Sequence, residues 1–152
     1  TYSAINTGIS GLAAAASDLT SDAFTSEVMG AIASAYAEDN AGNHVAFSDT
    51  VNTDWTAPVI AAGTPAGTAG NNGWWLSDVT VPFSATDNLS GFDAAGTLSA
   101  ALASQTILGE GIGLIVTSDG VCDYAGNFAA GITAGPYKVD RPRRLSRVRL
   151  TG

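Results

Sequence analysis

The sequence predicts an all-β protein, an antiparallel β-sandwich built from repeated units, and three observations lead to this prediction. Short segments alternate apolar and polar residues, and turns rich in glycine and asparagine separate them. A five-residue pattern occurs twice, as "DNAGN" at 39–43 and as "DYAGN" at 123–127. Charged residues make up only 13% of the chain and Cys122 is its one cysteine, so packing rather than an internal disulfide has to stabilise the fold.

The repeated pattern extends in both directions from these two pentapeptides. Each is followed by a short segment that ends in Asp shortly before a proline, "VNTDWTAP" at 51–58 and "YKVDRP" at 137–142. Upstream, "YSAINTGISGL" (2–12) aligns with "FSATDNLSGF" (83–92) when one glycine is counted as an insertion. The two pentapeptides are 84 residues apart, and self-similarity at a fixed period indicates a repeat architecture.

This alignment divides the chain into three parts. Residues 1–54 are the C-terminal part of one unit, and residues 55–140 are a complete unit. Residues 141–152 are a basic tail, which is either the first strand of a next repeat or an assembly strand. Inside the two units, the alignment brings Glu27 and Gly30 close to Glu110 and Gly113.

The first half of the complete unit is predicted from period-two patterns. "APVIAA" (57–62) is its first strand, and "NNG" (71–73) is a tight turn before Trp74. In "SDVTVPFSATD" (77–87) the apolar residues fall on one face, where we expect Val79, Val81, Phe83 and Ala85. Pro82 cannot donate a hydrogen bond to a neighbouring strand, so we expect an edge or a bulge there.

The second half supplies the other side of the core. "IGLIVTS" (112–118) is predicted as a more deeply buried strand, and "FAAGITAGPYKVD" (128–140) as a last strand broken at Gly135-Pro136. We expect the core to contain Val79, Val81, Phe83, Ile115 or its neighbours, and Tyr137 or Val139. The alanine-rich segment 12–40 favours a helix by propensity, but its alignment with 92–124 predicts strands.

These residues carry a family resemblance. "TAPVI", "GWWLSDVTVPFSATDNLSGF", "EG", "DYAGN" and "KVD" resemble, in this order, the bacterial immunoglobulin-like repeats of large surface and secreted proteins. The resemblance covers residues 55–140 well and residues 1–54 in part. It implies an immunoglobulin-like sandwich that runs in tandem as a stalk or spacer outside the cell. The tail departs from it, because "RPRRLSRVRLTG" has arginines where "TAPVI" stands at the earlier junction.

The charge is distributed very unevenly. Residues 1–137 contain thirteen acidic residues and no Lys or Arg, whereas residues 138–152 contain all six basic residues and one acid. A nucleic-acid-binding protein would instead spread positive charge over a folded face, so we expect no nucleic-acid partner. No apolar run reaches the roughly 18–20 residues of a membrane helix, so we expect no membrane insertion.

The basic tail and the acidic body suggest an assembly contact. The segment "RLSRVRLTG" (144–152) is strand-like, and residues 1–54 are expected to lack the first strands of their sandwich. We therefore predict that the tail of one copy inserts into the N-terminal half of the next and builds a fibre. A tail that simply belongs to the next repeat is the alternative. The predicted assembly residues are Arg144, Leu145, Arg147, Val148, Arg149 and Leu150.

The sequence predicts no catalytic residue and no bound cofactor. His44 is the only histidine and aligns with Phe128, so a Ser-His-Asp arrangement has little support. "GEGIG" (109–113) lies in a strand region and lacks the helix that a phosphate-binding loop requires. Cys122 aligns with Glu38, which favours a small buried side chain over a crosslink.

Two other residue sets have alternative interpretations. Asp39 and Asp123 open the repeated pentapeptides, where an Asx-turn explains an aspartate. Together with Asp54 and Asp140 at the predicted unit junctions, they are also candidate calcium ligands, because calcium binds carboxylate and carbonyl oxygens. Trp74 and Trp75 are adjacent in a predicted strand and so point to opposite faces. One is expected in the core, and an exposed one is a candidate for stacking on a glycan.

The functional prediction is a structural, immunoglobulin-like repeat segment of an extracellular surface or fibre-forming protein. Its expected partners are copies of itself or adjacent repeats. The alternative is a carbohydrate-binding or adhesion module that uses Trp74 and Trp75.

Overall fold

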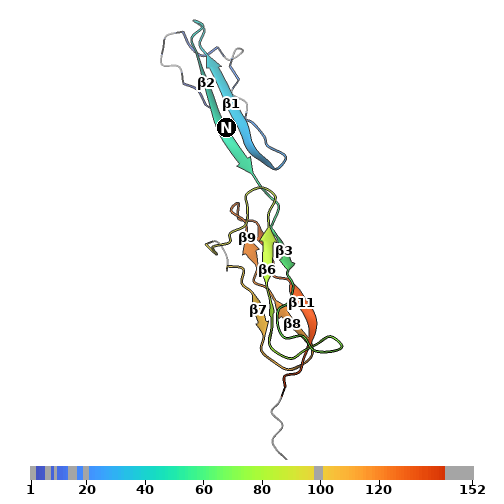
Figure 1. Ribbon diagram of the computed structural model, residues 1–152. Helices are drawn as coiled ribbons and strands as arrows, with labels where there is room; N and C mark the ends of the chain where they lie inside the picture. Colours follow the sequence, from blue (N-terminus) through green and yellow to red (C-terminus); the bar gives the residue numbers. More distant parts are fainter. Residues whose placement is uncertain are drawn as a thin grey trace, which may run out of the picture. The chain divides into compact units, whose positions relative to one another are not determined.

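The computed structural model describes residues 3–5, 8, 10–13, 17–18, 21–97 and 101–142, and these residues form strands, turns and loops without a helix. The chain divides into two compact units, Thr1–Trp55 and Thr56–Gly152, which we call the first and the second unit. Figure 1 shows the strands of each unit. The fold is therefore all-β, with several antiparallel sheets, and is consistent with the predicted β-sandwich.

The first unit is built on one long antiparallel hairpin. Strand β1 (Val28–Glu38) pairs with strand β2 (His44–Thr53) from Glu38↔His44 to Val28↔Thr53. The alanines of β1 support a strand because every second residue faces the same side, and Ala33 and Ala37 are only 7% exposed. The preceding chain lies against β1 through bridges from Leu12 to Asp39 and from Asp18 to Tyr36. Strand, not helix, is therefore the correct reading of residues 28–38.

The second unit contains nine strands within the described residues. One sheet has the order β4-β11-β8, in which β4 (Trp74–Trp75) pairs parallel to β11 (Thr133–Val139) and β8 (Gly111–Thr117) pairs antiparallel to it. The other strands form three antiparallel pairs. They are β3 (Val59–Ala62) with β6 (Phe83–Thr86), β5 (Val79–Val81) with β7 (Gln105–Ile107), and β9 (Val121–Cys122) with β10 (Phe128–Ala129).

Pro82 marks the point where the chain changes its strand partner. Before it, β5 pairs with β7, and after it, β6 pairs with β3. Proline has no N–H for a strand ladder, but its carbonyl oxygen still accepts a hydrogen bond from the Gly63 N–H at 2.8 Å. The sequence predicted an edge or a bulge within one strand at Pro82, and the structure instead has two strands there, with Pro82 connecting two strand pairs.

The core of the second unit lies between these pairs. Val79, Val81, Ile107 and Val139 are buried together, and six partly buried residues pack against them: Trp75, Phe83, Leu114, Val116, Ala134 and Tyr137. The prediction that 112–118 is a deeply buried strand is wrong, since Ile112 is 72% exposed and Ile115 is 58% exposed. Only one face of β8 meets the core, and that face carries Leu114 and Val116.

The same irregularity occurs in both units. In the first unit, Val28 pairs with Thr53 and the next pair is Ala31↔Val51. In the second unit, Gly111 pairs with Val139, and Leu114 pairs with Tyr137. Each skipped stretch holds a glycine with positive φ, Gly30 (φ 77) and Gly113 (φ 78), a backbone conformation that favours glycine.

The chain also leaves its last strand in the same way in both units. In the first unit, Oε1 of Glu27 accepts a hydrogen bond from the Trp55 N–H at 2.8 Å. In the second unit, Oε1 of Glu110 accepts one from the Arg141 N–H at 3.2 Å. These glutamates are the pair that the sequence alignment placed together, and each holds the residue that follows the last Asp of its unit.

Candidate functional site

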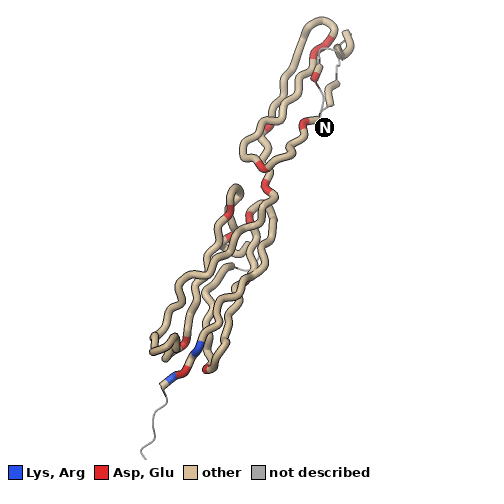
Figure 2. Tube along the Cα trace, turned by 90° about the vertical axis from the view of Figure 1, so that its right-hand side faces the viewer, with Lys and Arg blue, Asp and Glu red and all other residues tan. Residues whose placement is uncertain are grey.

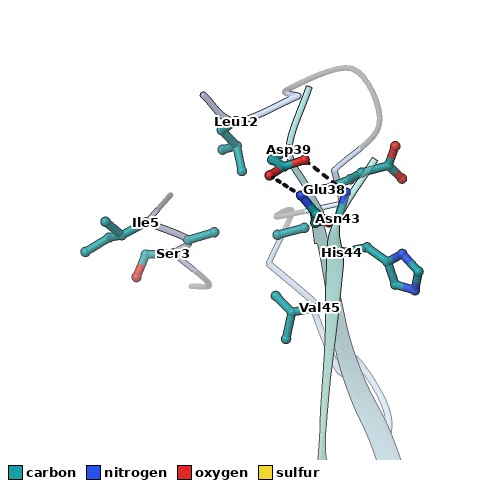
Figure 3. A pocket seen from close by; sticks show the side chains of 10 residues that line it. Ser3, Ile5, Leu12, Glu38, Asp39, Asn43, His44 and Val45 are labelled. Atoms are coloured by element: carbon teal, nitrogen blue, oxygen red, sulfur yellow. Dashed lines mark hydrogen bonds between the residues drawn. The ribbon is translucent and has the colours of Figure 1, made fainter. Parts of the chain in front are cut away.

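The first repeated pentapeptide forms a turn held by Asp39. Its Oδ1 accepts hydrogen bonds from the N–H groups of Ala41 and Asn43, both at 2.9 Å. Its Oδ2 accepts one from Nδ2 of Asn43 at 2.9 Å, as the dashed lines in Figure 3 show. The bonds from Asn43, first from its side chain and then from its backbone, lower the pKa of Asp39 to about 2.

The second pentapeptide forms a turn with the same Asp–Asn hydrogen bonds in a buried setting. Oδ1 of Asp123 accepts a hydrogen bond from the Asn127 N–H at 2.8 Å, and Oδ2 accepts one from Nδ2 of Asn127 at 2.7 Å. Asp123 is fully buried. The glycine at the fourth turn position has positive φ in both copies, at Gly42 (φ 88) and Gly126 (φ 96). The predicted Asx-turn is confirmed at Asp39, whose Oδ1 accepts from the N–H two residues on, and at Asp123 the carboxylate is held by the backbone and side chain of Asn127.

The entry to each turn is also alike. A bridge joins Leu12 to Asp39 in the first unit, and a bridge joins Phe92 to Asp123 in the second. Just beyond, Asn40 N–H donates to the Gly11 carbonyl and Tyr124 N–H donates to the Gly91 carbonyl, each at 3.0 Å. In each unit the turn is thus joined to a segment from earlier in the chain, residues 11–12 in the first unit and 91–92 in the second.

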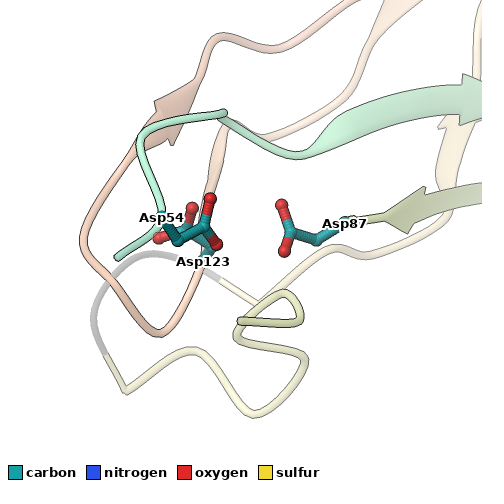
Figure 4. A group of neighbouring side chains, drawn as sticks. All are labelled: Asp54, Asp87 and Asp123. Carbon is teal, nitrogen blue, oxygen red and sulfur yellow. The ribbon is translucent and has the colours of Figure 1, made fainter. Parts of the chain in front are cut away.

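Asp123 belongs to a group of neighbouring carboxylates. Asp87 and Asp123, both of the second unit, each offer a carboxylate oxygen within 4.8 Å of the other, and Figure 4 shows the Asp87 side chain directed toward Asp123. Of the four predicted calcium ligands, Asp123 therefore has a neighbouring carboxylate in its own unit, whereas Asp54 belongs to the first unit.

Asp87 was missed by the sequence reasoning. It follows β6 directly, and its Oδ1 accepts hydrogen bonds from the N–H groups of Leu89 (3.0 Å) and Gly91 (2.9 Å). Its Oδ2 is buried and has no hydrogen-bond partner among the described residues. The alignment places Asp87 opposite Asn6, so no repeated aspartate drew attention to it. The only available signal was an Asp immediately after an alternating strand.

The chemistry of this group suits a hard cation. Calcium takes roughly six to eight oxygen ligands, and carboxylates are its preferred side chains. The unsatisfied Oδ2 of Asp87 is an acceptor that a cation would satisfy, and each Asp123 oxygen keeps a second lone pair beside its bond to Asn127. The two carboxylates of Asp87 and Asp123 do not fill this shell, so carbonyl groups or water would have to complete it.

The other two predicted ligands lie elsewhere. Asp39 is engaged by Asn43 in the turn of the first unit. Asp140 is exposed at the end of β11, where its N–H donates to the Trp75 carbonyl at 2.9 Å. Neither residue belongs to a group of three potential metal ligands in the part of the chain that the structure describes.

The two adjacent tryptophans have different surroundings. Trp75 packs against the core of the second unit. Trp74 is half-buried, and Nζ of Lys138 lies 5.6 Å from the centroid of its ring. The same ammonium group donates to the Asn72 carbonyl at 3.0 Å in the turn before β4. One face of Trp74 is therefore already in a cation–π contact.

The first unit has an open groove at the turn end of its hairpin. Its volume is about 470 Å³, and Figure 3 shows Leu12 and Val45 on the side where Ser3 and Ile5 lie. The ring of His44 points away and stacks on Tyr36, with 5.6 Å between the ring centroids. The Tyr36 hydroxyl donates a hydrogen bond to Oε2 of Glu38 at 2.6 Å. This bond is the largest cause of the raised pKa of Tyr36.

The remaining sequence predictions are placed as follows. Cys122 is half-buried in β9. The predicted assembly residues in 144–150 lie outside the described residues. Within the described part of the chain, no helix has the length and apolar character needed to cross a membrane. No protein-family model, curated protein or solved structure matches this chain.

Proposed function

We propose that this chain is a structural segment of an extracellular surface or fibre-forming protein, built from tandem immunoglobulin-like units. The observation that carries the proposal is the hydrogen bond from the Trp55 N–H to Glu27 and its counterpart from the Arg141 N–H to Glu110. Each bond holds the second residue after the last strand of its unit, β2 or β11. A chain that leaves successive units in the same way is suited to a stalk or spacer, because every junction then starts from the same geometry.

The turns and bulges support the same function. The Asp-Asn turn and the glycine bulge occur at matching places in both units. Their residues are engaged in holding the backbone, which is a structural task. The proposal therefore includes no catalysis, and its partners are adjacent units and other copies of the chain.

Immunolabelling of the producing cells tests the proposal. An antibody raised against the second unit should label the cell surface or extracellular fibres in electron micrographs of unpermeabilised cells. The control is the same antibody absorbed with purified protein, which should leave no label. Labelling confined to the cell interior would contradict the proposed location and function.

Carbohydrate binding is the second candidate, and the half-exposed ring of Trp74 favours it. A glycan array with the whole chain tests it. Binding that is lost in Trp74→Ala but kept in Trp55→Ala would support an adhesion module, since Trp55 is 56% exposed and lies in the first unit. An array without binding would contradict the adhesion module and leave the cation–π contact with Lys138 as the role of Trp74.

A further inference from the structure

The turn before β4 contains an asparagine followed by a glycine. Asn72 is the only asparagine of the chain that a glycine follows. The Trp74 N–H donates a hydrogen bond to the Asn71 carbonyl at 3.1 Å, and Asn72 (φ 55) and Gly73 (φ 75) both have positive φ. These are the features of a type I′ turn, for which Asn-Gly is a preferred central pair. Among the described residues, Asn72 is the only one other than glycine with positive φ.

An exposed Asn-Gly pair is chemically reactive. The backbone nitrogen of the residue after an asparagine can attack the carbon of the side-chain amide. Glycine permits this attack best, because it has no side chain to shield its nitrogen and its backbone adopts many conformations. Asn71, Asn72 and Gly73 are all exposed. The fold therefore leaves this turn accessible to water and hydroxide.

The ammonium group of Lys138 lies against the reacting peptide group. Its Nζ donates to the Asn72 carbonyl at 3.0 Å, and this carbonyl belongs to the peptide bond between Asn72 and Gly73. Basic residues in the described chain lie only near the end of the second unit, as Figure 2 shows. The attack requires the Gly73 N–H to lose its proton, which leaves negative charge on the nitrogen and on the carbonyl oxygen. A cation at hydrogen-bond distance stabilises that charge.

We propose that Asn72 is a site of spontaneous deamidation, assisted by Lys138. The deprotonated nitrogen of Gly73 forms a bond to Cγ of Asn72. The bond from Cγ to Nδ2 breaks, and ammonia leaves with a proton from water, which replaces the one that Gly73 lost. Water then opens the resulting cyclic imide at one carbonyl to give aspartate, or at the other to give isoaspartate. The reaction does not depend on where the protein is located, so its test is separate from the test of the proposed function.

Isoaspartate would lengthen the main chain of the turn by one carbon atom. The hydrogen bond between Asn71 and Trp74 closes over two central residues of normal length, so the longer turn cannot keep it. Strand β4 follows directly and pairs with β11 through Trp74↔Lys138 and Trp75↔Val139. Because Trp75 packs against the core, we expect isoaspartate at this turn to destabilise the second unit.

Incubation of the whole chain at mildly alkaline pH tests the site. Peptide mass spectrometry should show conversion of Asn72 to aspartate and isoaspartate, at a rate that rises with pH. Asn40 is the internal control, since it is also exposed but is followed by an alanine, and it should stay intact. Lys138→Met should slow the conversion about fivefold, the effect of one charge at this distance in a water-like medium. Lys138→Arg keeps the charge and should convert nearly as fast as the unaltered chain.

Asn72→Gly is the matched control for stability, because Gly-Gly also suits this turn and has no amide to lose. After the incubation, the second unit of the unaltered chain should melt at least about 4 °C lower than before, and that of Asn72→Gly should melt as before. An intact Asn72, faster conversion of Asn40, or undiminished conversion in Lys138→Met would each overturn the inference. Isoaspartate at residue 72 with unchanged melting would overturn its effect on β4.

Discussion

A single aspartate performs the same task in two different environments. Asp39 and Asp123 both accept hydrogen bonds from the backbone and side chain of the asparagine four residues later. Asp39 is partly exposed, whereas Asp123 is fully buried next to Asp87. The pentapeptide sequence sets the turn, and the surroundings decide what else its carboxylate can do.

The turn at Asp39 should be sensitive to acid. Its pKa is lowered from 3.8 to about 2 because the ionised form accepts the bonds from Asn43 and Ala41. A lowered pKa means that this contribution to stability is present above pH 3.8 and is lost as the pH falls toward 2. A titration of the Asp39 carboxyl carbon by NMR should therefore have its midpoint near 2.

Asn43→Ala is the control for this titration. It removes the side-chain hydrogen bond from Asn43, which is the largest cause of the lowered pKa of Asp39. The midpoint of the Asp39 titration should therefore move up toward the ordinary value of an aspartate. If the unaltered chain already titrated near its ordinary value of 3.8, the hydrogen bonds would not stabilise the carboxylate as described.

The carboxylates of Asp87 and Asp123 should make the second unit sensitive to calcium. Calcium that binds only the folded state raises the melting temperature, and a chelator reverses this effect. Asp87→Asn should abolish the calcium-dependent rise, because it replaces the buried oxygen that has no partner among the described residues. Asp140→Asn should leave the rise intact, since Asp140 lies outside the carboxylate group. Melting curves that are the same with calcium and with chelator would assign these carboxylates to turns alone.

At the scale of single elements, consecutive short strands pair with different neighbours and still contribute to one core. Strands β5 and β6 are separated only by Pro82 and belong to different strand pairs. Their inward residues continue across the break, because Val79, Val81 and Ala85 are all buried. The alternation of side chains therefore persists although the hydrogen-bond partner changes.

Val81→Ala should weaken the second unit substantially. Val81 is fully buried in the cluster with Val79, Ile107 and Val139. Removing two buried carbons, at roughly 0.8 kcal/mol each, and leaving a cavity should lower the free energy of unfolding by about 2 kcal/mol. Val59→Ala is the control, since Val59 is 65% exposed. It should change the value by less than about 0.5 kcal/mol in urea unfolding. Equal effects of the two substitutions would contradict the core described.

At the scale of the whole molecule, the two units differ in how much apolar surface they bury. Among the described hydrophobic residues, the first unit buries only Ala33 and Ala37. The second unit buries four valines together with Ile107 and Ala85. Hydrophobic stabilisation is roughly proportional to the apolar area buried, so the second unit is expected to be the more stable one.

Calorimetry should separate the two units. We expect two unfolding transitions, the lower one from the first unit and the upper one from the second. Val81→Ala should shift only the upper transition, whereas Ala33→Gly should shift only the lower one. A single transition that both substitutions move together would show that the chain unfolds as one cooperative body.

The local features of this protein could be read from its sequence. Alternation placed Val79 and Val81 in the core, and the pentapeptides placed both Asp turns. The alignment of residues 12–40 with 92–124 led to the correct strand β1 where alanine content favoured a helix. These predictions succeeded because side-chain alternation and turn chemistry depend on residues close together in the chain.

Other features were decided only by tertiary structure. Ile115 and Val116 are both β-branched and apolar, and only packing against β5 and β7 selects which face of β8 turns inward. Asp87 joins Asp123 because a loop after β6 meets a turn after β9. Asp123 is buried and Asp39 is partly exposed because different parts of the chain cover the two turns. Sequence by itself determined the alternation in 79–85 and the Asp turns of this protein. Contacts between distant segments decided its strand partners, its core face and its carboxylate group, because burial and proximity are properties of the packed chain.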